Sequence, residues 1–198
     1  MTRSVPVSFA TSNKHKIEQA RLCLDPSGIR IRWIRDRYDE ASDDTIEQVA
    51  AKGAAFLAEK RGEPVIVEDT GLFFDAYPDF PGAMPKFVFE RIGYDGLFRL
   101  LRSKPKGAIF RSCVGYCEPG KRPRVFSGEM HGRIILQIHC PHKDVLPYER
   151  VFVPKGKTLP MCKLSPEEKQ DISHRMEAFR IFASWFSKKK IAPESFKW

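Results

Sequence analysis

Residues 65–82 read VIVEDTGLFFDAYPDFPG. The first three form a short, wholly apolar run after a proline, which is typical of a strand buried in the middle of a sheet. Glu68 and Asp69 follow directly. Because neighbouring strand residues point to opposite faces, we expect the two carboxylates to have different partners, one structural and one catalytic. The stretch therefore predicts a charged site at the end of a central strand.

The patterns on both sides of this strand predict an α/β fold with a mixed sheet. Helical spacing of apolar residues is found in residues 14–24, 45–60, 87–103 and 165–186, the third of these as one or two helices. Alternating patterns predict strands over residues 5–10, 29–34, 108–117 and 124–138, the last two as a hairpin. The proline-rich residues 78–85 are expected to form a loop. At 198 residues, the chain suits a single domain.

The formal net charge of +9 results from 34 Lys and Arg against 25 Asp and Glu. This excess favours anionic partners such as nucleotides. The cations are scattered along the sequence and the aromatic residues occupy mostly apolar periodic positions, so we expect no nucleic-acid partner. No apolar run approaches the roughly 20 residues of a membrane span, so we expect no membrane contact and a cytoplasmic protein.

Five cysteines at irregular spacings are unlike a secreted disulfide framework, so we expect reduced thiols. An alternative is a zinc site formed by Cys113, Cys117, His139, Cys140 and His142. The first two lie on a predicted strand, where four residues span ~13 Å. They are too far apart to share one zinc ion at ~2.3 Å per bond, so ordinary buried thiols are the favoured interpretation.

Asp69, Thr70 and Gly71 form the triplet that carries the catalytic aspartate of aspartic proteases. Such an enzyme needs two aspartates that share a proton, whereas this chain has the triplet once. The helices predicted on both sides of Asp69 also conflict with the all-β fold of that class. The single triplet and the predicted helices therefore argue against an aspartic protease.

A polar turn, TSNKHK at residues 11–16, lies between the first predicted strand and the first predicted helix. Backbone N–H groups at a helix N-terminus, two hydroxyls, an amide and cations are suited to phosphate oxygens. The turn lacks the glycines of a Walker A loop. Glu40 adds a third carboxylate after the second predicted strand, and hard oxygen ligands of this kind suit Mg²⁺ bridged to phosphates. Together these residues suit the cleavage of a phosphoanhydride.

Three segments resemble, in the right order, the signatures of the inosine triphosphate pyrophosphatase family. They are ATSNKHKIEQA (residues 10–20), VEDTGLFFDAYPDFPG (67–82) and SPEEKQDISHR (165–175). These house-cleaning enzymes hydrolyse non-canonical purine nucleoside triphosphates such as ITP, dITP and XTP to the monophosphate and pyrophosphate. The resemblance implies an elongated mixed sheet flanked by helices and two lobes around a nucleotide cleft. It also implies a smaller lobe of roughly residues 106–160, and a homodimer.

The resemblance further implies a role for individual residues. Glu40 and Asp69 would hold Mg²⁺, with Mn²⁺ as the other candidate ion, and Asp69 would also activate water. Glu68 would support the catalytic site together with Lys16. The residues implied to bind the substrate are Thr11, Ser12, Asn13, Lys16, Lys52 and Thr70 on the phosphate side, and Lys169, His174 and Arg175 from the C-terminal helix.

One segment departs from the family pattern. Where the family has aromatic-glycine-aromatic-aspartate-proline, this chain has Leu146-Pro147-Tyr148-Glu149-Arg150. Tyr148 would still stack on a base and Glu149 would replace the aspartate. We therefore predict retained catalysis with an altered or looser base preference. Two alternatives stay open: a catalytically idle nucleotide sensor and a basic nucleic-acid-binding module.

Overall fold

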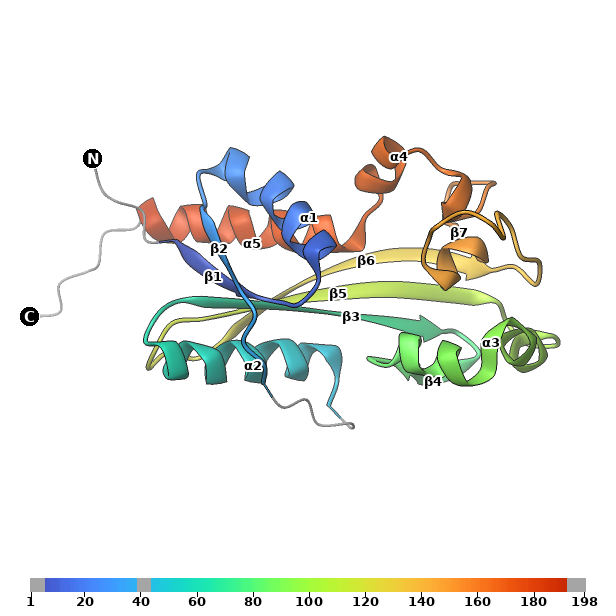
Figure 1. Ribbon diagram of the computed structural model, residues 1–198, viewed down its shortest axis with the longest axis horizontal. Coiled ribbons are helices and arrows are strands. Elements are labelled where there is room, and N and C mark those ends of the chain that lie inside the picture. The colour runs from blue at the N-terminus through green and yellow to red at the C-terminus, as the bar shows by residue number, and fades with distance from the viewer. Residues whose placement is uncertain (1–5, 39–43, 192–198) are drawn as a thin grey trace, which may run out of the picture.

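The computed structural model describes residues 6–38 and 44–191, and a seven-stranded mixed sheet forms its centre. The strands are β1 (Val7–Ala10), β2 (Ile31–Ile34), β3 (Val65–Phe74), β4 (Tyr77–Gly82), β5 (Gly107–Cys117), β6 (Arg124–Ile134) and β7 (Phe152–Pro154). Their order is β2-β1-β3-β5-β6-β7, with β4 paired to β3. Strand β1 runs parallel to β2 and β3, and the remaining pairs are antiparallel. The predicted mixed sheet is confirmed, and it is elongated (Figure 1).

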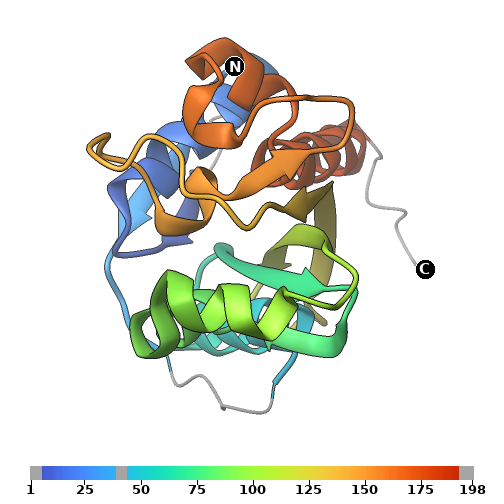
Figure 2. The ribbon, with the colours of Figure 1, turned by 90° about the vertical axis from the view of Figure 1, so that its right-hand side faces the viewer.

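Helices cover both faces of the sheet. They are α1 (Lys14–Leu24), α2 (Ile46–Arg61), α3 (Pro85–Leu101), α4 (Pro166–Asp171) and α5 (His174–Ile191), with short 3₁₀ turns η1 (Asp25–Ser27), η2 (Pro147–Arg150) and η3 (Met161–Lys163). Figure 1 shows α1 and α5 on one face and α2 and α3 on the other. Figure 2 shows α3 on one side of the sheet end and the η2–β7 segment on the other. Within the described ranges, no helix has the length and apolar character needed to cross a membrane.

Two predictions about the central region were wrong. Strand β3 continues well past the apolar run, because its pairing with β5 extends from Val65 opposite Cys117 to Phe74 opposite Ala108. The expected loop in residues 78–85 is instead largely strand β4, which pairs with β3 at the sheet edge. Proline is tolerated at such an edge, since the missing N–H faces away from the ladder.

The helix ends follow their capping residues. Thr45 and Ser165 each form a capping box, with Gln48 and Glu168 respectively, at the starts of α2 and α4. The C-terminal helix predicted over residues 165–186 is broken, because α4 ends at Asp171 and α5 begins at His174. Helix α3 contains a non-helical Gly93 with φ of 58°, which agrees with the expectation of one or two helices.

The apolar core divides along the sheet. One cluster packs Ile66 of β3 against α1 and α5, and includes Phe179 and Phe182. A second cluster packs Leu72 of the same strand against α3, η2 and β7. Alternation places Glu68 and Thr70 on the face between Ile66 and Leu72. The polar site therefore interrupts the core midway along β3.

Candidate functional site

Glu68 is the centre of a buried ion cluster. Its side chain is fully buried, with Lys16 Nζ 2.8 Å from Oε2 and Arg175 Nε 3.0 Å from Oε1. Burial alone would raise the pKa of the carboxyl group, but the charges of Arg175 and Lys16 outweigh it and hold the pKa well below its usual range. Glu68 is therefore charged at neutral pH and joins α1, β3 and α5.

Two hydroxyl groups complete the shell around this carboxylate. Thr70 Oγ1 donates to Glu68 Oε1 at 2.6 Å, and Ser112 Oγ donates to the same oxygen. Arg175 Nη2 donates to Thr70 Oγ1 at 3.3 Å. Ser112 lies on β5 directly opposite Thr70. Sequence reasoning missed Ser112, because a single serine in a strand pattern gives no sign of its cross-strand partner.

In the part of the chain that the structure describes, one edge of β3 is unpaired next to Glu68 and Asp69, which we call the acidic pair. The pairing of β1 with β3 ends at Ala10 opposite Val67, and the pairing of β4 with β3 begins at Leu72 opposite Gly82. Among the described strands, none pairs with residues 68–71 on this edge. Lys16 Nζ donates to the Glu68 carbonyl oxygen there at 2.9 Å. The polar turn that follows β1 therefore reaches the acidic pair directly.

That turn forms the N-terminus of α1. Asn13 caps the helix, with Oδ1 accepting from the His15 backbone N–H at 2.9 Å. Thr11 Oγ1 accepts from the Asn13 N–H at 3.1 Å. Ser12 and Asn13 are exposed and Thr11 is half-buried. Of the predicted phosphate-binding residues, Thr11, Ser12 and Asn13 thus lie at an accessible helix N-terminus, where an anion is favoured.

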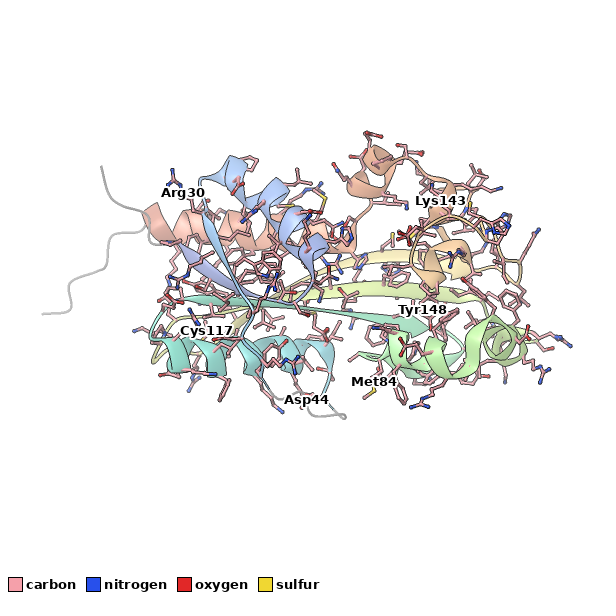
Figure 3. All side chains as sticks on the ribbon, viewed as in Figure 1. Arg30, Asp44, Met84, Cys117, Lys143 and Tyr148 are labelled. Carbon is pink, nitrogen blue, oxygen red and sulfur yellow. The ribbon has the colours of Figure 1, made fainter. Side chains whose placement is uncertain are left out.

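Asp69 occupies the other face of β3. Val65 and Val67 pack against α2, and alternation places the half-buried Asp69 on that same face. Lys52 of α2 is mostly exposed, and its Nζ lies 2.5 Å from Asp44 Oδ1. Asp44 lies on the α2 face (Figure 3) and was not predicted. Glu40, the other predicted metal ligand, lies outside the described residues.

His174 begins α5 beside Arg175. Its ring stacks on Phe110 at a centroid distance of 5.4 Å and an interplanar angle of 21°. Both ring nitrogens are inaccessible to water, and neither has a hydrogen-bond partner among the described residues. Burial, and then the charge of Arg175, lower the pKa of His174 to about 3. The imidazole is therefore neutral, with one donor and one acceptor unsatisfied.

Residues 146–150, the segment that departs from the family pattern, include η2 and contribute Tyr148 to the second core cluster. Tyr148 is 7% exposed, and its OH donates to the Pro85 carbonyl oxygen at 3.2 Å. Its ring contacts Phe110 edge to face at a centroid distance of 6.3 Å. Glu149 pairs with Lys169 of α4 at 2.5 Å. In this structure Tyr148 is a core side chain, while Glu149 and Lys169 are joined as a pair.

Comparison with known proteins points to one family. The family model described as the Ham1 family matches residues 7–185. The dITP/XTP pyrophosphatase of Methanopyrus kandleri is 41% identical over 181 residues, which cover 91% of this chain and 95% of that protein. The protein of the same name from Methanosarcina mazei is 35% identical, with coverages of 91% and 96%.

Solved structures share the fold. The Ham1 protein of Staphylococcus aureus aligns with a TM-score of 0.77 at 21% identity, covering 93% of this chain and all of that chain. A nucleoside-triphosphatase, also called dITP/XTP pyrophosphatase, from Mycobacterium abscessus aligns with a TM-score of 0.73 at 25% identity. This alignment covers 90% of the present chain and 97% of the other.

Proposed function

Because the chain belongs to the Ham1 family, we propose that it is a hydrolase that cleaves non-canonical purine nucleoside triphosphates to the monophosphate and pyrophosphate. The names of its relatives indicate dITP and XTP as the first substrates to test. The observation that carries the proposal is the convergence of two distant segments, α1 and α5, on Glu68 of β3. Lys16, Thr70 and Arg175 come from α1, β3 and α5, and all contact this carboxylate or each other.

The phosphates would bind at the open edge of β3. The N-terminus of α1 presents N–H groups beside the hydroxyls of Thr11 and Ser12, which suits phosphate oxygens. Lys16 lies between this turn and β3, and Lys52 of α2 would have to leave Asp44 to reach the phosphates. These two cations would offset the charge that develops on the leaving pyrophosphate.

A divalent metal fits the face that carries Asp69. Its half-buried carboxylate is a hard oxygen donor, and Mg²⁺ binds through one or two protein carboxylates together with substrate phosphates. The same chemistry admits Mn²⁺. Asp69 and Glu40 would hold the ion, which would neutralise phosphate charge when bound.

The Asp69 carboxylate would also act on the nucleophile. It would accept a proton from the water that attacks the α-phosphorus, and the pyrophosphate oxygen would depart on the opposite side. Glu68 is committed to Lys16 and Arg175 on the other face, so it would hold these cations in position. The acidic pair thereby divides into a base and an anchor.

The base would lie near His174 and the Glu149–Lys169 pair. The ring nitrogens of His174 are covered in this structure, but once uncovered, a neutral imidazole with an unsatisfied donor and acceptor would suit a purine that also offers both. Tyr148 is packed in the core, and Leu146 is 70% exposed at the position of the family's first aromatic. We propose that this altered segment loosens or shifts the base preference.

We also propose the two-lobed organisation, with residues 106–160 as the smaller lobe, a cytoplasmic location and a homodimer. The separate apolar clusters on either side of Glu68 support the two lobes. Sedimentation equilibrium tests the dimer, because a mass equal to one chain at micromolar concentration would exclude it.

The deciding experiment measures pyrophosphate and orthophosphate release with Mg²⁺ for ITP, XTP, dITP and the four common nucleoside triphosphates. We expect pyrophosphate release that is fastest for one or more of the non-canonical substrates. Orthophosphate release would indicate cleavage between the β- and γ-phosphates, and not between the α- and β-phosphates as proposed. Tight binding without any turnover would replace the hydrolase with a nucleotide sensor.

A further inference from the structure

A groove of about 930 Å³ lies at the end of the sheet formed by the β5–β6 turn and the last turns of α5. Its lining includes five cations and one acid, Glu118, around the half-buried ring of Trp185. The cations are Lys121, Arg122, Arg124, Lys188 and Lys189. This volume is near the upper end of the roughly 300–1,000 Å³ of ligand pockets. We call this feature the basic groove.

The fold gathers cations that are scattered in the sequence. Residues 121–124 and residues 188–189 are far apart along the chain, but the hairpin turn and the end of α5 meet at the same end of the sheet. The expectation of no nucleic-acid partner relied on that scattering. Sequence spacing could not reveal the cluster, because only the packing of α5 beside β6 creates it.

The charges in the basic groove are only partly neutralised. Glu118 pairs with Lys189 and also accepts a hydrogen bond from the Tyr116 hydroxyl at 2.5 Å. Arg122 and Lys188 are exposed and form no ion pair with any described residue. Among the described residues, at least two full positive charges therefore face solvent without an acid at ion-pair distance.

Flat surfaces accompany these charges. The Arg124 guanidinium lies 5.2 Å from the centroid of the Trp185 ring, and Lys189 Nζ lies 5.5 Å from the same centroid. Planar guanidinium and indole groups offer stacking surfaces to nucleobases, and cations beside them contact backbone phosphates. A second copy of this chain would bring like charges together, which disfavours self-association at this surface.

We propose that the basic groove binds single-stranded nucleic acid. The cations contact the phosphate backbone, and Arg124 with Trp185 provides the surface on which a base stacks. An acidic peptide would satisfy the cations but would leave these planar surfaces unused. Single strands are favoured over duplex, because only unstacked bases reach an aromatic ring.

The basic groove is separate from the site around Glu68. None of the residues assigned to phosphate, metal or base lines it. Cys117, which precedes the β5–β6 turn, and Tyr148, in the base segment, lie toward opposite ends of the molecule (Figure 3). Nucleic-acid binding at the basic groove can therefore be tested independently of triphosphate hydrolysis.

The test is fluorescence anisotropy with labelled (dT)₁₂ and (rU)₁₂ on the full chain, in EDTA so that nucleotide hydrolysis is silent. The groove variant is Arg122→Glu/Lys188→Glu, and both positions are exposed. The matched control, Arg102→Glu/Lys104→Glu, changes the same residue types and the same net charge at exposed positions just after α3. We expect at least a tenfold loss of affinity in the groove variant and less than a threefold loss in the control.

Salt dependence gives a second readout. Four phosphate contacts at about −0.7 each predict a slope near −3 for the logarithm of the binding constant against that of salt. The wild type would then bind roughly 50-fold more weakly in 200 mM than in 50 mM salt. The groove variant should lose part of this slope, and the difference between the DNA and RNA oligonucleotides identifies which polymer is preferred.

Stacking is tested with Arg124→Lys, which keeps the charge but removes the planar group. We expect weaker oligonucleotide binding with an unchanged salt slope. Equal losses in the groove variant and its control would overturn the proposal, because they would reflect net charge alone. Displacement of the oligonucleotide by a 12-residue polyglutamate at the same concentration as by unlabelled (dT)₁₂ would overturn it as well.

Discussion

Lys16 Nζ lies 2.8 Å from the Glu68 Oε2 atom and 2.9 Å from the Glu68 carbonyl oxygen. One ammonium group thus holds both the side chain and the backbone of a single acidic residue. The contact fixes the start of α1 to β3 at the point where β1 has ended. Any ligand that recruits Lys16 therefore acts directly on the strand that carries Asp69.

Glu68→Gln should strongly destabilise the protein. The substitution leaves Lys16 and Arg175 without their buried counter-charge, and breaking such a pair costs about 3–5 kcal/mol. Urea unfolding at pH 7 measures the free energy of unfolding. Glu90→Gln is the control, because Glu90 pairs with Lys86 one helical turn away on the exposed face of α3, where we expect a loss below about 1 kcal/mol. Equal losses would show that the Glu68 cluster is not the electrostatic anchor.

Ser112→Ala should cost about 1–3 kcal/mol, because Glu68 loses a donor that burial prevents water from replacing. Ser127→Ala on the neighbouring strand is the control, since Ser127 is exposed. If Ser112 also helps to position the site, kcat/KM should fall with the substitution while the fold remains intact. If Ser112→Ala unfolded with the same free energy as the wild type, Ser112 would not contribute to stabilising the Glu68 cluster.

The mixed sheet could be predicted from apolar spacing, whereas the meeting of the segments that form the site could be predicted only from the family resemblance. Apolar spacing located α1 and α2, and the capping residues Thr45 and Ser165 marked helix starts. The meeting of Lys16, Thr70 and Arg175 could be inferred only from the family resemblance, because no spacing connects them. Ser112 was missed since its role depends on the register that sets it opposite Thr70.

Some boundaries could not be predicted because neighbouring strands determine them. The local sequence of residues 65–74 does not show that β3 extends to Phe74. The extension results from pairing with the neighbouring strand β5. Tyr148 was expected beside a base, but its aromatic neighbours on α3 and β5 hold it in the core. These contacts depend on tertiary packing, which local pattern does not encode.

His174 should make stability depend on pH in the mildly acidic range. The unfolded chain binds a proton at this residue near pH 6.5, whereas the folded protein does so only near pH 3. The contribution is thus fully present above about pH 6.5 and is lost as pH falls, by up to about 1.4 kcal/mol per pH unit. His174→Gln should flatten this dependence in urea unfolding between pH 7 and 5. His142→Gln, at an exposed position, should leave the slope unchanged.

Gly128→Ala should displace the start of α5. A Cβ at this position would lie 2.2 Å from the His174 carbonyl oxygen and 2.6 Å from the Ala178 nitrogen, so the helix backbone must shift. We expect a stability loss of about 1–3 kcal/mol and a larger loss of kcat/KM than in Ser127→Ala. A crystal structure with α5 unmoved would contradict this account.

Asp69→Asn should strongly reduce the rate of hydrolysis without unfolding the protein. The residue is half-buried beside the open edge of β3, and the amide keeps the shape of the side chain but cannot accept the proton from water. Loss of a general base lowers the rate about 10²–10⁴-fold. Acid-quenched single-turnover conversion of nucleotide to monophosphate, with enzyme in excess over nucleotide and with Mg²⁺, isolates this step from product release, and Asp95→Asn on the exposed side of α3 is the control. A rate within threefold of wild type would assign the base elsewhere, and Glu68 could not replace it, since Lys16 and Arg175 hold its carboxylate on the opposite face.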